Sequence, residues 1–359
     1  MLTDRLDTPF RLGSIDLKNR VVMAPMTRCR ALGNLANQLM ATYYAQRAEA
    51  GLIITEGTAP APEGLGYARI PALYDQAHAD AWRLVTDAVH AAGSRIVVQL
   101  MHTGRVGHPL NMPAGARLLA PSAIAAPGSM YTDQEGPKEH PVPEAMSEAD
   151  IEAAIEAFAH AAELAVAAGF DGVELHGANG YLIEQFLNTA SNQRSDRWGG
   201  SVEGRARFAV EVARRAAARI GAGRVGIRLS PYGANGGMVV DPDTDRLYLH
   251  LARELGALGL AFVHLVDHSA MGAPPVPAAI KEGIRAAFGG PVILCGGFDA
   301  ATADAELDAG RAELIAFGRP FLANPRLLTA MRRGLPLAAP NFALAYTPGP
   351  EGYTDYPLE

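Results

Sequence analysis

Residues 172–182 read Gly-Val-Glu-Leu-His-Gly-Ala-Asn-Gly-Tyr-Leu. The first four form a short, mostly apolar run typical of a buried strand, so His176, Asn179 and Tyr181 should lie together at its carboxyl end. In an α/β barrel, that end carries the chemistry. Two hydrogen-bonding side chains and a phenol that can give a proton are suited to bind an anionic or carbonyl oxygen.

Outward from this stretch, short runs rich in Val, Ile and Leu alternate with longer Ala-rich stretches, as in a parallel sheet with helical crossovers. Strands are expected at 21–24, 52–56, 95–100, 172–175, 225–229, 262–266, 292–295 and 314–317. Helices are expected at 75–92, 147–168, 203–220 and 243–258, the second beginning with a Ser147-to-Asp150 cap. Eight alternations predict an α/β fold of the (β/α)8 TIM-barrel type, because a doubly wound sheet needs fewer strands.

Two segments depart from a bare barrel. Residues 10–17 contain a Gly-Ser turn and predict an N-terminal hairpin that closes the bottom of the barrel. Residues 102–146 form a long Pro- and Gly-rich stretch after the third strand, which predicts a capping loop over the site. The whole chain, 1–359, is expected to form a single domain.

Composition narrows the class of protein. The chain has 359 residues, of which 49% are hydrophobic and 19% charged, a globular balance. A net charge of −7 without a Lys/Arg-rich run argues against nucleic acid or an anionic membrane as partner. No apolar stretch has transmembrane length and the first residues do not read as a signal peptide, so we expect a cytoplasmic location. Cys29 and Cys295 have no metal-ligand spacing, so neither a disulfide framework nor an iron–sulfur cluster is expected.

Glycine turns follow the last two expected strands. Gly296 and Gly297 come just after one strand end and Gly318 after the next, so backbone N–H groups can approach an anion there. Arg319 adds a cation that can clamp it. Each turn alone is usually only a turn, but the pair at strands seven and eight indicates a phosphate site.

Residues 187–201 read Leu-Asn-Thr-Ala-Ser-Asn-Gln-Arg-Ser-Asp-Arg-Trp-Gly-Gly-Ser, followed by Arg205, Arg207 and Phe208. Together with 176–182, this segment closely resembles the Old Yellow Enzyme family of FMN-dependent ene-reductases. It is most similar to the bacterial branch that includes pentaerythritol tetranitrate and N-ethylmaleimide reductases. The resemblance runs from about Phe10 to Pro357, and 176–208 is its most specific part.

The resemblance implies bound FMN and assigns residues to it. Pro25 and Met26 would give backbone contacts, Thr27 would donate to the O4 edge, and Gln99 would pair with the pyrimidine edge. Arg228 would stabilise the negative charge of reduced flavin near N1. The full set of expected FMN-binding residues is Pro25, Met26, Thr27, Gly57, Gln99, Arg228, Gly296, Gly297, Phe298, Phe317, Gly318 and Arg319.

Each of these residues also has a plainer interpretation. Thr27 could be a helix cap, Gln99 a satisfied polar group and Arg228 a member of an ion pair. Taken together, polar groups at several different strand ends, all suited to one heterocycle, favour the flavin.

For the reaction, the resemblance implies reduction of an activated C=C bond with NADPH or NADH as reductant. His176 and Asn179 would hold the carbonyl or nitro oxygen of the substrate, and Tyr181 would protonate the α-carbon. Tyr67, Met101 and Tyr346 would line the substrate pocket. Met101 replaces the bulky aromatic of many relatives, which predicts a roomier and more adaptable pocket.

Alternatives remain at this stage. His176 could be structural, or it could share a metal site with His102, although no carboxylate has a matching spacing. A Schiff-base lyase would need a strand-end lysine, and the three lysines, Lys18, Lys138 and Lys281, are expected in turns or helices. A flavin-binding protein without turnover is the third possibility. The expected partner is a small electron-poor alkene, with quinones or nitrate esters as further substrates, and the expected state is a monomer or weak homo-oligomer.

Overall fold

The computed structural model describes residues 5–358. Its eight central strands are parallel and form one closed barrel, which confirms the predicted (β/α)8 architecture. Around the barrel they are β3 (Val21–Met23), β4 (Leu52–Thr58), β5 (Arg95–Leu100), β10 (Gly172–Gly177), β11 (Val225–Leu229), β12 (Phe262–Val266), β13 (Val292–Cys295) and β14 (Leu314–Phe317), and β14 pairs with β3 again.

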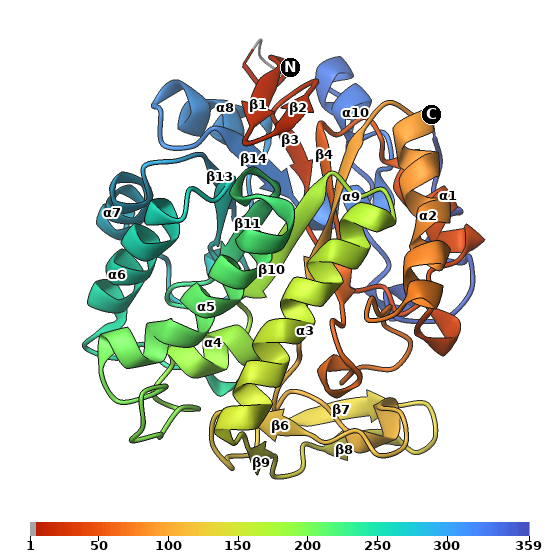
Figure 1. The fold of residues 1–359 in the computed structure, drawn as a ribbon. Coiled ribbons are helices and arrows are strands. Elements are labelled where there is room, and N and C mark those ends of the chain that lie inside the picture. The colour runs from red at the N-terminus through yellow and green to blue at the C-terminus, as the bar shows by residue number, and fades with distance from the viewer. Residues whose placement is uncertain (1–4, 359) are drawn as a thin grey trace.

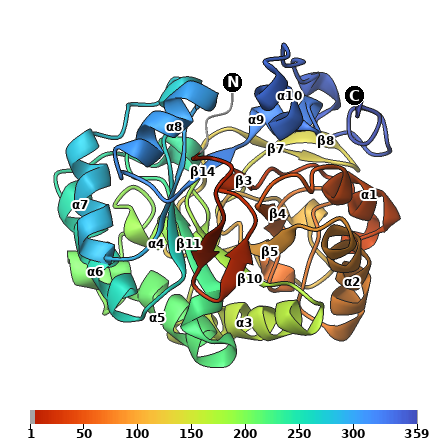
Figure 2. The same cartoon turned by 90° about the horizontal axis from the view of Figure 1, so that it is seen from above.

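Helices surround the barrel (Figures 1 and 2). They are α1 (Gln38–Gln46), α2 (Gln76–Ala91), α3 (Glu148–Ala167), α4 (Leu182–Leu187), α5 (Val202–Ile220), α6 (Thr244–Ala257), α7 (Ala278–Phe288), α8 (Ala300–Asp308), α9 (Arg319–Ala323) and α10 (Leu327–Arg333). Short 3-10 turns lie at Leu32–Asn34, Pro62–Gly64, Pro109–Asn111, Ala222–Arg224, Asn235–Gly237, Ser269–Met271 and Phe342–Leu344. The four helices expected from the sequence are confirmed to within one residue at each end. Ser147 and Asp150 form the expected capping box of α3.

Two strands run further than the sequence indicated. β10 continues to Gly177, because His176 and Gly177 still pair with Arg228 and Leu229 of β11. His176 is therefore the penultimate residue of the strand rather than the first residue after it. β4 continues to Thr58 through a bulge between Ile54 and Gly57.

The barrel interior is filled in layers by side chains that alternate along each strand. The lower layers are apolar and include Val22, Ile54, Val97, Phe262 and Ile293. A side chain at position 226 would lie 2.2 Å from the Phe262 ring, so glycine there leaves room for the aromatic. Two residues further along β5, β12 and β13, the inner face carries Gln99, His264 and Cys295.

The expected hairpin is present at the amino end of the barrel. β1 (Phe10–Leu12) and β2 (Ile15–Leu17) pair antiparallel, and Leu12, Ile15 and Leu17 pack into the interior cluster. Figure 2 shows the hairpin crossing the barrel opening.

The segment 102–146 lies at the opposite end of the molecule from the hairpin (Figure 1). It is not a plain loop. Its strands are β6 (Leu119–Ala120), β7 (Ser129–Thr132), β8 (Gly136–Glu139) and β9 (Glu144–Ala145), paired as β6–β9 and β7–β8. Val106, Ala126 and Met130 of this segment pack against Tyr67 and Tyr181, so it covers the expected site.

Within residues 5–358, no helix combines the length and apolar character needed to cross a bilayer.

Candidate active site

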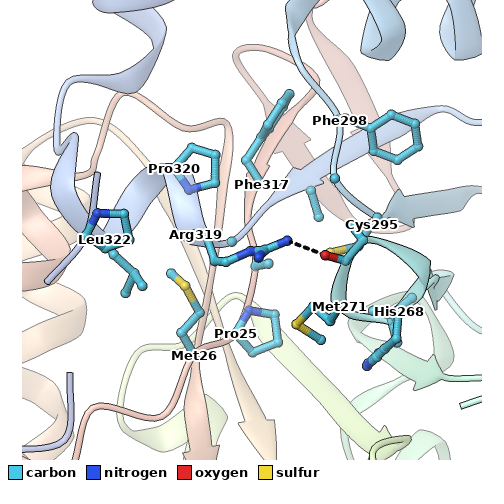
Figure 3. A pocket seen from close by; sticks show the side chains of 18 of the residues that line it. Pro25, Met26, His268, Met271, Cys295, Phe298, Phe317, Arg319, Pro320 and Leu322 are labelled. Atoms are coloured by element: carbon cyan, nitrogen blue, oxygen red, sulfur yellow. Dashed lines mark hydrogen bonds between the residues drawn. The ribbon is translucent and has the colours of Figure 1, made fainter. Parts of the chain in front are cut away.

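Two adjoining cavities lie at the carboxyl ends of the strands, with volumes of about 610 Å³ and about 210 Å³. Both are lined by Pro25, Thr27, Asn179, Arg228 and Tyr346, so they form one continuous site. The larger cavity adds the glycine turns (Figure 3), and the smaller one adds His176 and Tyr181. Of the eighteen residues expected at the site, only Gly57 is absent from both linings.

Gly57 lies behind Met101. A Cβ atom at position 57 would lie 2.4 Å from the Met101 sulfur, so the glycine leaves space for the Met101 side chain. Met101 is buried and lines the smaller cavity. The structure thus gives Gly57 a packing role that its position in the sequence did not indicate.

His176 is held as a neutral donor. Its Nδ1 accepts a hydrogen bond from the Ala178 N–H at 3.3 Å, so in the neutral ring Nε2 carries the proton. Burial, followed by the nearby charges of Arg228 and His264, lowers the pKa of His176 well below its ordinary value. The imidazole is therefore neutral at physiological pH and can donate from Nε2.

Asn179 lies in a left-handed conformation, with φ of 61°, at the tight turn after β10. Its backbone N–H donates to Ser230 Oγ at 3.0 Å, and its Oδ1 is buried without a hydrogen-bond partner among the described residues. At the next position, Gly180, a Cβ atom would lie 2.5 Å from the Asn235 carbonyl oxygen, so the turn requires glycine there.

A buried carboxyl group supports this turn, and the sequence reasoning missed it. Glu184 of α4 accepts hydrogen bonds from the Gly180 N–H at 2.6 Å, Ser230 Oγ at 2.6 Å and Tyr248 at 3.1 Å. Burial raises the pKa of Glu184 to about 7. A charged residue inside the apolar helix 182–187 was the one signal that could have indicated it.

Tyr181 begins α4 and points into the smaller cavity. Its hydroxyl lies 2.9 Å from the Tyr67 hydroxyl, and its ring packs edge-on against His176 with centroids 4.8 Å apart. Burial raises the pKa of Tyr181 well above 10 and that of Tyr67 to about 12. Both phenols therefore keep their protons at neutral pH, as a proton donor must.

Arg228 is a buried cation at the junction of the two cavities. Its side chain belongs to none of the ion pairs in residues 5–358, which removes the plainer ion-pair interpretation. It is 5% exposed, its Nε has no hydrogen-bond partner, and its Nη2 lies 3.6 Å from Cys295 Sγ. A buried charge of this kind is costly unless an anionic or electron-rich group meets it.

Below Arg228, the polar inner layer continues as a chain of buried groups. Gln99 Nε2 donates to Glu174 Oε1 at 2.8 Å, and Glu174 Oε2 lies 2.7 Å from His264 Nδ1. Because the carboxylate requires a donor, the Gln99 amide nitrogen faces Glu174, which leaves its Oε1 for the smaller cavity. The amide nitrogen of Gln99 thus bonds within the protein, and its amide oxygen is available to a ligand.

The glycine turns lie together in the larger cavity. Gly297 has φ of 72°, and a Cβ atom there would lie 2.8 Å from Ala270 Cβ, so local packing also requires this glycine. Arg319 reaches across the cavity and donates to the Ala270 carbonyl at 3.3 Å (Figure 3). The backbone turns and Arg319 form a cationic part of the cavity, and Met26 lies beside it, since a Cβ atom on Gly318 would be 3.7 Å from the Met26 sulfur.

Thr27 and Tyr346 are the last two predicted site residues to be located. No helix begins directly after Thr27, since the next helical turn starts at Leu32, so the helix-cap interpretation is ruled out. Tyr346 reaches the rim from the C-terminal segment, which Arg28 and Arg30 hold through the Ala345 carbonyl at 3.1 and 2.5 Å.

The competing chemistries find little support in the geometry. Among residues 5–358, no group of three or more His, Cys, Asp or Glu side chains is arranged to hold a metal ion. His102 lines neither cavity, and burial lowers its pKa to about 3. No lysine lines either cavity. Lys138 lies in the capping strand β8, which corrects the expectation of a turn or helix, and Lys281 lies in α7.

Comparisons with known proteins agree with this geometry. Residues 5–338 match the NADH:flavin oxidoreductase / NADH oxidase family. A probable flavin mononucleotide-dependent alkene reductase of Leishmania infantum is 40% identical, over 98% of this chain and 96% of that protein. The structure of morphinone reductase is 42% identical with a TM-score of 0.94, over 98% of this chain and 96% of the other. The Old Yellow Enzyme homologue of Zymomonas mobilis is 39% identical with a TM-score of 0.94, over 99% of both chains.

The fold and the site therefore define a flavin-dependent oxidoreductase on a (β/α)8 barrel. The chain belongs to the NADH:flavin oxidoreductase / NADH oxidase family and is an ene-reductase of the Old Yellow Enzyme type, as the resemblance implied. Its cofactor is FMN and its reductant a nicotinamide coenzyme.

Proposed function

We propose that this protein uses NAD(P)H to reduce the C=C bond of small electron-poor alkenes, namely enones, enals, maleimides and nitroalkenes. Quinones and nitrate esters are further candidate substrates. One observation carries the proposal. Arg228 is buried, has no anionic partner in the described part of the chain, and lies where a ring-sized cavity meets a pocket that holds neutral His176 and Asn179.

FMN fits the larger cavity by its chemistry. The glycine turns at Gly296, Gly297 and Gly318, with Arg319, would hold the phosphate. Arg228 would meet the N1–O2 edge, whose negative charge on reduction matches the buried guanidinium. The free Oε1 of Gln99 can accept from a ring N–H. The other proposed contacts come from Pro25, Met26, Thr27, Phe298 and Phe317.

FMN held by these residues would supply the hydride chemistry that links NAD(P)H to the alkene. The protein prepares the alkene for that step. Nε2 of His176 and the amide of Asn179 would donate to the carbonyl or nitro oxygen, where negative charge develops. The His176 ring is held by the Ala178 N–H before the substrate binds, and the Asn179 backbone is held by Ser230, so little reorganisation of these elements opposes the reaction.

Tyr181 would then give its proton to the α-carbon. The hydroxyl of Tyr67, 2.9 Å away, can donate to the Tyr181 oxygen as that proton leaves. Met101 and Tyr346 complete the pocket wall, and the flexible thioether of Met101 would let substrates of different width enter.

A spectroscopic experiment tests the proposal. The purified protein should be yellow, should bleach on anaerobic addition of NADPH or NADH, and should recover its colour when cyclohexenone is added. A protein that takes up no FMN, or a bleached protein that cyclohexenone leaves colourless, would contradict the proposal.

Two variants distinguish an enzyme from a flavin-binding protein without turnover. Tyr181→Phe and His176→Ala should each slow cyclohexenone reduction, and His176→Ala should also weaken phenol binding. A Schiff-base lyase would instead form an adduct with a carbonyl substrate that borohydride traps, and no such adduct is expected.

We further propose that residues 1–359 act as one FMN-binding domain in the cytoplasm, as a monomer or weak homo-oligomer. Light scattering at several protein concentrations tests the oligomeric state.

A further inference from the structure

Cys295 occupies a position that the proposed reaction does not use. It is the last residue of β13 and shares the inner face of the barrel with Ile293. Its side chain is partly exposed and lines the larger cavity (Figure 3). A nucleophile therefore lies on the wall of the space that FMN would fill.

The thiol belongs to a cluster of titratable groups. Arg228 Nη2 lies 3.6 Å from its sulfur, and His264 interacts with it from the neighbouring strand β12. Glu174 holds His264 Nδ1 at 2.7 Å, and His264 Nε2 is buried without a hydrogen-bond partner among the described residues. A carboxyl-bound imidazole and a guanidinium, which are groups that can lower the pKa of a nucleophilic thiol, therefore lie beside Cys295, on strands β12 and β11.

Groups near Cys295 lower the pKa of its thiol. Burial raises the pKa of the Cys295 thiol, but the neighbouring His264 imidazole and the positive charge of Arg228 outweigh burial and hold the pKa below its ordinary value. Burial also opposes a charged His264, yet Glu174 raises the pKa of that imidazole overall.

Cys29, the other cysteine, provides an internal contrast. It is buried, and burial together with the charge of Glu56 raises the pKa of its thiol to about 12. Cys29 should therefore be inert under conditions in which Cys295 reacts.

We propose that Cys295 is a covalent modification site for electron-poor alkenes, and that bound FMN shields it. The inference rests on the proposed function, because it takes its ligand class and its shield from there. In the step, the sulfur bonds to the β-carbon and the π pair of the C=C bond moves to the α-carbon. The α-carbon takes up one proton while the thiol gives up its own. The net reaction adds S–H across the double bond and needs neither oxidant nor reductant.

The adduct would occupy the larger cavity, so a modified chain could no longer take up FMN. Alkenes of the class that the loaded enzyme reduces would thus permanently inactivate flavin-free chains. Bound FMN would protect the chain from this alkylation.

The test uses the full-length protein at several FMN loads, each load measured from the flavin absorbance. N-ethylmaleimide is added without NAD(P)H, so that no reduction competes. Intact mass and peptide mapping then give the modified fraction and its position. We expect one adduct, on Cys295, in a fraction equal to the flavin-free fraction at every load. An adduct fraction independent of FMN load, or modification of Cys29 first, would overturn the proposal.

Variants and pH sharpen the test. After maleimide treatment, flavin-free Cys295→Ser should still take up FMN whereas the parent protein should not, and Cys295→Ala serves if the serine variant misfolds. Cys29→Ser is the matched control and should be modified like the parent. The rate of Cys295 alkylation should reach half its maximum at a lower pH than the alkylation of a small free thiol measured alongside.

The two proposals can fail separately. If the protein binds FMN and reduces cyclohexenone but its flavin-free fraction resists N-ethylmaleimide until denatured, only the modification site is wrong. If no FMN is taken up, the proposed function fails as well.

Discussion

At the amino end of the barrel, Leu12, Ile15 and Leu17 of the hairpin close over an interior of Val, Ile, Leu and Phe side chains. At the carboxyl end, the same inner face carries Arg228 and His264, and both have buried nitrogen atoms without partners among the described residues. At the amino end, the interior side chains pack against one another. At the carboxyl end, polar groups remain available to a ligand. The comparison suggests that stability comes from the hairpin end and function from groups whose partners are not protein.

The largest effect is expected from removing both oxygen donors. His176→Ala combined with Asn179→Ala should slow alkene reduction by about 10³–10⁴-fold, because one donor to a developing oxyanion typically contributes about 10²–10³-fold and two donors to one oxygen are not additive. Stopped-flow reoxidation of the NADPH-reduced protein by cyclohexenone measures it. FMN affinity should be unchanged, and a parallel loss of FMN would show that the pair supports the cofactor instead.

Tyr181→Phe should have the next largest effect. Loss of the proton donor should slow the same step by roughly 10²-fold or more, while reduction by NADPH keeps its rate. Tyr67→Phe is the matched control and should cost less, because Tyr181 remains. In the parent protein, burial keeps the pKa of Tyr181 well above 10, so reoxidation should not slow through phenol ionisation between pH 7 and 9. Equal rates for Tyr181→Phe and the parent would exclude the tyrosine as donor.

At the hairpin end, Leu12→Ala should act on stability alone. Removing this fully buried side chain should lower the free energy of unfolding by about 2–5 kcal/mol, through lost burial and a new cavity. Urea unfolding measures the loss and flavin fluorescence measures FMN affinity. If FMN affinity fell together with stability, the two ends would not be independent.

A pH-dependent effect within the same range concerns the carboxyl group under the Asn179 turn. Burial raises the pKa of Glu184 from 4.5 to about 7, so the folded state holds this proton more tightly than the unfolded state. Ionising it costs stability as pH rises from 4.5 to 7, by roughly 3 kcal/mol at about 1.4 kcal/mol per pKa unit. Glu184→Gln should therefore gain stability relative to the parent between pH 5 and pH 8. A difference that does not change with pH would mean that Glu184 is ionised at ordinary cost.

The sequence predicted the barrel because buried parallel strands are continuous apolar runs, and eight of them can be counted. It did not predict the capping strands, since β6 and β9 have two residues each and β7 and β8 only four, which is too short for a clear period. The strand ends were underestimated at β10, where His176 and Gly177 remain paired because β11 extends beside them.

The candidate site could be outlined from the sequence where residues lie at or just after strand ends, as Asn179, Arg228 and Arg319 do, and their roles stay predictions. The hydrogen bonds of Glu184 with Ser230 and Tyr248 could not be predicted. These partners are 46 and 64 positions away from Glu184 in the sequence and meet it only in the folded chain. Gly57 shows a related limit. At the β4 bulge, Gly57 lies so close to Met101 that a Cβ atom would clash with the Met101 sulfur. No linear pattern in the sequence reveals that contact.

Replacing Arg228 by Met, at the junction of the two cavities, tests the contrast between the ends most directly. Thermal unfolding of the parent and of Arg228→Met would be followed with and without saturating FMN. Without FMN, the variant should be at least as stable as the parent, because it no longer buries an uncompensated charge. With FMN, the parent should gain a large rise in Tm and the variant much less. A variant that gains the full FMN-induced rise, or that is strongly destabilised without FMN, would contradict the view that this cation is kept for the flavin.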